Sequence, residues 1–183
     1  MSLPIPKSYA GDDTPPLANT PILIYGGGST AAQYTIQLLK AAGYKKILTT
    51  ASPHHHEYLK SLGATDVFDY RSTSLTEDVI KAAGGKIKLV LDSITAEATI
   101  AAISKFIDPE GTLAILLPIK KGDRVRADGD ASAMSFELSP GHPLAKTVLV
   151  KSVRAFLYQE VSILLDAEDL VNWLIRMNTS RII

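Results

Sequence analysis

From residue 21 onward, short apolar runs alternate with longer stretches that mix apolar and polar residues, several of which stop at glycine. The apolar runs are typical of buried strands and the mixed stretches of helices. Strands are predicted at residues 22–25, 46–51, 66–68, 87–91, 111–117 and 147–150. Helices are predicted at residues 29–42, 53–62, 75–83, 95–106 and 160–177. This alternation predicts a Rossmann-type α/β fold, a doubly wound parallel sheet of about six strands with helices on both faces.

Two segments interrupt the alternation. Residues 1–20 are rich in proline and have little helix or strand signal, which predicts an extended leader or linker. Residues 119–146 are charged and rich in turn-forming residues, which predicts an exposed loop or lid. Residues 21–183 are therefore expected to form one dinucleotide-binding domain.

Composition narrows the classes of function. Hydrophobic residues make up 46% of the 183 residues, enough for one well-packed core. The 19 basic and 19 acidic residues cancel, so no attraction to nucleic acid or to an anionic membrane is expected. The absence of cysteine excludes disulfides, thiolate nucleophiles and cysteine-ligated zinc. No apolar run is long enough to span a bilayer and no secretion signal is present, so a cytoplasmic protein is expected.

A glycine-rich turn joins the first predicted strand to the first predicted helix. Its pattern, Gly26-x-Gly28-x-x-Ala31, fits the dinucleotide fingerprint with alanine in the last position. The first glycine makes the tight turn, the second lets the backbone approach a pyrophosphate, and the small third residue lets the helix pack on the strand. The helix N-terminus offers unpaired N–H groups to the phosphates, and Ser29 and Thr30 can add hydroxyl donors.

Other interpretations of this turn are weaker. A glycine-rich turn that binds no ligand is the simplest alternative. A Walker A loop, the Tyr-x-x-x-Lys signature of short-chain dehydrogenases and the Gly-x-Ser-x-Gly elbow of hydrolases all fail to occur in the chain. A dinucleotide is therefore the expected ligand.

The residues after the second strand favour NADPH over NADH. In NAD-selective sites an acid at this point accepts hydrogen bonds from the ribose hydroxyls. Here the first acid is Glu57, inside the predicted helix, and the turn itself has Ser52 followed by three histidines. A serine hydroxyl at a helix start favours the extra 2′-phosphate, and Tyr70 and Arg71 follow the third strand nearby. A metal site is not expected, because adjacent histidines on a helix point in different directions.

The chain resembles a known family through several motifs that come in order. The resemblance is to the cofactor domain of medium-chain dehydrogenase/reductases, in the zinc-independent quinone oxidoreductase branch that includes fungal trans-enoyl reductases. It covers about residues 21–150. The motifs are Tyr25-Gly-Gly-Gly-Ser-Thr-Ala31, Tyr34-Thr-Ile-Gln-Leu-Leu-Lys40, Ala51-Ser-Pro-His54, Leu59-Lys-Ser-Leu-Gly-Ala64, Val67-Phe-Asp-Tyr-Arg71 and Leu91-Asp-Ser-Ile94.

The resemblance implies a division of the site into three parts. Gly28, Ser29, Thr30 and Ala31 would hold the pyrophosphate. The 2′-phosphate end of the adenosine would be held by Ser52, His54, His55 and Tyr70. The nicotinamide side would be contacted by Leu116 and Leu117. Members of this family carry an N-terminal GroES-like catalytic domain, and the resemblance therefore implies that residues 1–183 are an excised or truncated cofactor domain without it.

The expected function follows from this resemblance. In a full-length context, the domain would serve an enoyl or quinone reductase that transfers hydride from NADPH to an activated double bond or a quinone. A stand-alone NADPH-binding or sensing module without turnover is the main alternative, and a Rossmann-fold transferase such as a methyltransferase is a weaker one. No catalytic residue is identified; Asp92 is expected either to position groups near the cofactor or to cap a turn. A small-molecule substrate is the expected partner, and apolar surface left by a missing domain suggests a homodimer.

Overall fold

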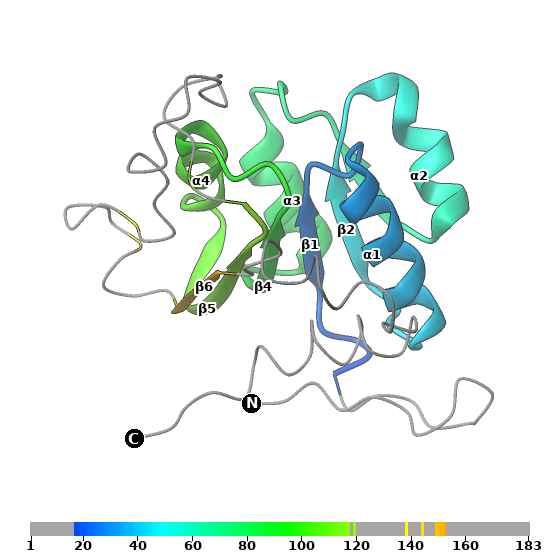
Figure 1. Cartoon of the computed structure of the whole chain (residues 1–183), viewed down its shortest axis with the longest axis horizontal. Coiled ribbons are helices and arrows are strands. Elements are labelled where there is room, and N and C mark those ends of the chain that lie inside the picture. Colours follow the sequence, from blue (N-terminus) through cyan, green and yellow to red (C-terminus); the bar gives the residue numbers. More distant parts are fainter. Residues whose placement is uncertain (1–16, 118, 120–137, 139–143, 145–148, 153–183) are drawn as a thin grey trace, which may run out of the picture.

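The sheet of the computed structural model is six-stranded and wholly parallel, in the order β3-β2-β1-β4-β5-β6. The structure describes residues 17–117, 119, 138, 144 and 149–152 (Figure 1). The strands are β1 Ile22–Tyr25, β2 Ile47–Thr50, β3 Asp66–Phe68, β4 Ile87–Asp92, β5 Ile107–Ile115 and β6 Leu149–Ser152. This strand order is that of dinucleotide-binding Rossmann folds, with a switch point between β1 and β4.

Helices cover both faces of the sheet, as predicted. They are α1 Thr30–Ala41, α2 His56–Leu62, α3 Leu75–Ala83 and α4 Glu97–Ile103, with a 3₁₀ turn η1 at Pro53–His55. Successive side chains of a strand point to opposite faces, so β1 divides its residues between two cores. Ile22 and Ile24 pack with α1 and α2, whereas Leu23 packs with α3 and α4. The doubly wound fold is confirmed.

The fifth strand begins earlier than the sequence predicts. The sequence predicts a strand start at residue 111 and a helix that extends to Phe106, and Pro109 and Gly111 are residues that weaken a strand. In the structure Ile107 pairs with Ile87, and the register with β4 shifts between Ile87 and Leu89. This irregularity in the pairing of β4 with β5 accommodates the proline and the glycine within the strand. Helix α4 therefore ends at Ile103, and Phe106 is fully buried.

Several predicted elements extend beyond what the structure describes. The sixth strand is found at Leu149–Ser152, close to the predicted 147–150. The helix predicted at 160–177, residues 1–16 of the predicted leader and most of the loop predicted at 119–146 lie outside the described residues.

Two buried tyrosines make the domain sensitive to alkaline pH. Burial raises the pKa of both Tyr25 and Tyr44 from 10.0 to about 12, with the Asp92 charge as a further cause at Tyr25. A raised folded-state pKa contributes stability that is present below pH 10.0 and is lost as the pH rises through about 12.

We therefore expect the melting temperature to fall between pH 10.0 and about 12, in step with tyrosinate absorbance at 295 nm. Tyr44→Phe is the informative variant, because the Tyr44 hydroxyl is buried and has no hydrogen-bond partner among the described residues. It should keep the neutral-pH melting temperature and weaken the alkaline loss. An alkaline transition of unchanged size in Tyr44→Phe would contradict this assignment.

Candidate cofactor-binding site

The glycine turn after β1 is anchored to the ends of β2 and β4. Gly26 has a φ of +87°, in the left-handed region that favours glycine. Its N–H donates to the Thr50 hydroxyl at 3.0 Å, and the Gly27 N–H donates to the Thr50 carbonyl at 2.8 Å. Ser93 lies on the other side, where its hydroxyl is 2.8 Å from the Tyr25 carbonyl oxygen and 3.0 Å from that of Gly26. The turn is thus fixed by both neighbouring strands.

Gly27 is the glycine that sequence reasoning missed. The fingerprint leaves this position open to any residue, yet a Cβ here would lie 2.3 Å from the Thr49 hydroxyl oxygen. That hydroxyl is itself held by a 2.7 Å hydrogen bond to the Ile24 carbonyl. Three consecutive glycines in the sequence were the available signal. The second is required by packing between β1 and β2 rather than by a ligand.

Gly28 faces open space. It is exposed, and a Cβ built on it would meet only the His55 ring, at 3.8 Å. Its carbonyl accepts a 3.1 Å hydrogen bond from the Gln33 side chain, which in turn accepts one of 3.4 Å from the Tyr58 hydroxyl. Sequence reasoning gave Gln33 and Tyr58 no role. The Gln33 side chain therefore holds the Gly28 carbonyl, while the side of Gly28 where a Cβ would lie stays open to solvent.

The first turn of α1 presents unpaired amides to this open side. Ser29 is the N-cap residue: its hydroxyl oxygen accepts from the Ala32 N–H at 3.2 Å and its hydroxyl donates to Ser93 at 3.0 Å. Within the described residues, the N–H groups of Gly28, Thr30 and Ala31 donate no hydrogen bond. Such amides, together with the positive end of the helix dipole, favour an anion. The Ser29 hydroxyl is thus engaged in hydrogen bonds within the protein, to Ala32 and Ser93, whereas Thr30 is exposed to solvent.

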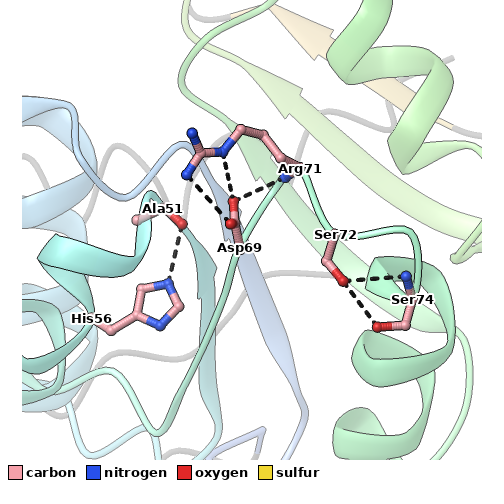
Figure 2. A network of polar contacts seen from close by, with 6 residues as sticks. All are labelled: Ala51, His56, Asp69, Arg71, Ser72 and Ser74. Carbon is pink, nitrogen blue, oxygen red and sulfur yellow. Dashed lines mark hydrogen bonds and ion pairs between the residues drawn. The ribbon is translucent and has the colours of Figure 1, made fainter.

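Ser52, His54 and His55, from the predicted adenosine end, lie at η1, whereas Tyr70 follows β3. Ser52 precedes η1 and makes no side-chain cap hydrogen bond. The rings of His54 and His55 lie 3.9 Å apart between centroids, and His55 is the one that approaches Gly28. His56 turns away and its Nε2 contacts the Ala51 carbonyl at 3.1 Å (Figure 2). Of these residues, His55 thus lies against the glycine turn, and His54 lies beside His55.

Beside them, the chain after β3 forms an ion pair. The Arg71 guanidinium donates from Nε to Asp69 at 3.2 Å and from Nη2 at 3.4 Å, as Figure 2 shows. The guanidinium carbon also lies 5.4 Å from the centre of the Tyr70 ring, which is 47% exposed. The hydrogen bonds from Arg71 lower the pKa of the Asp69 carboxyl, and the nearby His56 acts in the same direction. A carboxylate and a cation therefore lie at the predicted adenosine end.

Asp92, at the end of β4, organises the turn after this strand. It is fully buried and accepts from the N–H groups of Ile94 and Thr95, each at 2.9 Å, and from the Thr99 hydroxyl. These bonds hold Thr95 at a φ of 54°, a conformation that branched residues rarely adopt. Of the two roles considered for Asp92, the contacts are those of a turn-capping residue.

Removal of the Asp92 carboxylate should destabilise the fold. Asp92→Ala leaves buried N–H donors unpaired and is expected to lower the free energy of unfolding by about 2 kcal/mol. Asp92→Asn keeps one acceptor oxygen and should lose less. Urea denaturation followed by circular dichroism measures both. Equal losses in the two variants would show that charge, rather than hydrogen-bond acceptance, is what the turn requires.

The predicted nicotinamide side lies at the same edge of the sheet. Leu116 and Leu117 directly follow β5 and are half-buried. The Leu116 N–H donates to the Asp92 carbonyl at 3.3 Å, which continues the β4–β5 ladder past the last paired residues. Since the strands are parallel, their carboxyl ends share one edge, where open α/β sheets bind ligands.

The described residues contain no group of three or more histidine, aspartate or glutamate side chains that could hold a metal ion. The chain has no cysteine. In the same part of the chain, no helix combines the length and the apolar character needed to cross a bilayer.

The chain is similar to known dehydrogenases and reductases. Residues 32–122 match the zinc-binding dehydrogenase family. The trans-enoyl reductase TOXD of Cochliobolus carbonum is 41% identical over 91 residues, which are 50% of this chain and 30% of that protein. The enoyl reductase component lovC of the lovastatin nonaketide synthase of Aspergillus terreus is 38% identical over 97 residues, 52% of this chain and 26% of that protein. The chain thus spans less than a third of these curated relatives.

Solved structures share the fold. Escherichia coli quinone oxidoreductase, crystallised with NADPH, has a TM-score of 0.59 at 19% identity and covers 87% of this chain and 45% of its own. The CurK enoyl reductase has a TM-score of 0.57 at 18% identity, and the match covers 90% of this chain and 45% of the CurK chain. At these identities the likeness shows the fold alone.

Proposed function

Because this chain belongs to the zinc-binding dehydrogenases, as a cofactor domain of the medium-chain dehydrogenase/reductase superfamily, we propose that it binds NADPH in preference to NADH. The observation behind the proposal is the glycine turn. Within the described residues, the amides of Gly28, Thr30 and Ala31 are unpaired at the N-terminus of α1, beside an open approach. Backbone amides in this arrangement suit a pyrophosphate.

The preference for NADPH is supported by the residues directly after β2. The turn at residues 51–55 offers the Ser52 hydroxyl and two histidines, and it has no carboxylate. An acid here would repel a 2′-phosphate, whereas hydroxyl and imidazole groups at the start of a 3₁₀ turn can donate to one. The E. coli quinone oxidoreductase of the same fold was crystallised with NADPH, which agrees with the proposal.

We propose further that the domain serves the reduction of an activated double bond or a quinone. Bound NADPH supplies the hydride for such a reaction. The residues of this chain bind and orient: the glycine turn and α1 hold the diphosphate, and Leu116 and Leu117 offer an apolar wall at the end of β5. Fungal relatives named as trans-enoyl reductases support this reaction class.

The test has two stages with the purified chain. NADPH and NADH are titrated while the fluorescence of the reduced nicotinamide is followed, and markedly tighter binding of NADPH is expected. Absorbance of NADPH is then followed with quinones and with enoyl thioesters. Saturable oxidation supports the reductase, binding without oxidation supports a module that only binds NADPH, and equal affinities for the two cofactors would refute the preference.

A further inference from the structure

The ion pair of Asp69 and Arg71 lies at the carboxyl end of β3, next to the proposed adenosine end of the NADPH site. Strands β2 and β3 pair up to Thr50 and Phe68, and the Ala51 N–H donates to the Phe68 carbonyl at 2.9 Å. The residues that follow β2 and those that follow β3 therefore lie side by side, as Figure 2 shows for Ala51 and Asp69.

Asp69 is a carboxylate in the neighbourhood where NAD-selective sites place their acid. Such sites take the acid from the end of the second strand, whereas Asp69 follows the third. Its side chain is 28% exposed and its pKa is lowered, so it is charged at neutral pH. Left uncovered, this charge would repel a 2′-phosphate and accept from the ribose hydroxyls of NADH.

Arg71 forms an ion pair with the Asp69 carboxylate and so balances its charge. Its Nε and Nη2 donate to the two carboxylate oxygens, and the guanidinium stays within 5.4 Å of the Tyr70 ring centre. A guanidinium has five N–H donors, and Nη1 donates no hydrogen bond to any described residue. The Arg71 side chain is 60% exposed. The guanidinium can therefore bind Asp69 through Nε and Nη2 while Nη1 donates to an oxyanion.

We propose that Arg71 is the residue that sets the choice of NADPH over NADH: it receives the 2′-phosphate and shields that phosphate from Asp69. The inference rests on the proposed function, because it assigns a residue within the same site. Arg71 adds to the set of Ser52, His54, His55 and Tyr70, and Asp69 explains why a cation is needed at this corner.

The test uses two probes that differ only in the phosphate in question, adenosine 2′,5′-bisphosphate and 5′-AMP. Their dissociation constants are measured by calorimetry for the unmodified chain, Arg71→Ala and the double variant Asp69→Asn/Arg71→Ala. Lys60→Ala is the matched control, because Lys60 is also an exposed cation in a short ion pair, with Glu57 at 3.0 Å.

Arg71→Ala removes the cation and uncovers Asp69, and both changes disfavour the 2′-phosphate. We expect binding of the bisphosphate to weaken by about tenfold or more, with 5′-AMP within about twofold. The double variant Asp69→Asn/Arg71→Ala should bind the bisphosphate about threefold more tightly than Arg71→Ala, because the unbalanced Asp69 carboxylate no longer repels the 2′-phosphate. Lys60→Ala should change neither probe.

Three results would overturn the inference. Arg71→Ala could leave the bisphosphate unaffected, it could weaken both probes equally, or Asp69→Asn could recover nothing. These results leave the proposed function intact as long as the unmodified chain binds the bisphosphate more tightly than 5′-AMP. An unmodified chain that binds neither probe would overturn the proposed function and this inference with it.

Discussion

Gly26→Ala is expected to lower the free energy of unfolding by about 3 kcal/mol, from backbone strain and overpacking together. Gly26 has a φ of +87°, which a residue with a Cβ adopts only under strain. The added Cβ would lie 2.4 Å from Ile94 Cγ1 and 2.8 Å from the Ser93 hydroxyl oxygen. Ser93 cannot move away easily, because it hydrogen-bonds the carbonyls of Tyr25 and Gly26. Urea denaturation followed by circular dichroism measures the loss.

The matched control is Gly28→Ala, two residues along the same turn. Gly28 has no positive φ, and a Cβ there meets only the His55 ring at 3.8 Å. Its free energy of unfolding should stay within about 0.5 kcal/mol of that of the unmodified chain. The interpretation of the turn would be wrong if both variants lost stability equally, or if Gly26→Ala lost none.

Ser52→Asp is expected to reverse the proposed preference between the two cofactors. The change places a carboxylate after β2, where NAD-selective sites have one. It repels the 2′-phosphate of NADPH and accepts hydrogen bonds from the ribose hydroxyls of NADH. Since like charges in contact oppose binding by several kcal/mol, NADPH affinity should fall by about a hundredfold while NADH affinity is kept or improved. Fluorescence titration of each cofactor measures the change.

Ser61→Asp controls for the added negative charge. Ser61 is exposed in the last turn of α2, and its hydroxyl donates to the Tyr58 carbonyl within its own helix. This variant should leave the ratio of the two affinities unchanged. If Ser52→Asp bound NADPH as tightly as before, the 2′-phosphate would have to lie elsewhere, and the proposed adenosine end would be abandoned.

The two sides of the glycine turn are held by different kinds of contact. On the β2 side, Thr49 and Thr50 bond the backbone of β1 and of the turn. On the β4 side, Ser93 bonds both the turn and the N-cap residue Ser29, while Asp92 fixes the next turn. The amides at the start of α1 are therefore placed by side chains from strands that are neighbours of β1 only in the folded sheet. These contacts fix the positions of the amides without any ligand.

The fold could be predicted from the sequence because its signals are local. A short apolar run such as Ile22–Tyr25 can be recognised as a buried strand without knowledge of its partners, and so can Ile87–Asp92, where four of six residues are apolar. Alternation with helices then restricts the topology to right-handed parallel units. The start of β5 escaped this reasoning, since proline and glycine suggest a turn unless a pairing such as that of Ile107 with Ile87 is known.

The sequence by itself determined the doubly wound fold, the glycine turn at its first strand-to-helix corner and the lack of an acid after β2, because each is written in neighbouring residues. Only the tertiary structure decided why Gly27 must be glycine and which side chain holds both the turn and the Ser29 hydroxyl. Those answers depend on Thr49 and Ser93, which lie far from the turn along the chain and meet it only in the folded sheet. Hydrogen bonds and close contacts act over a few ångströms of space, whatever the separation along the sequence.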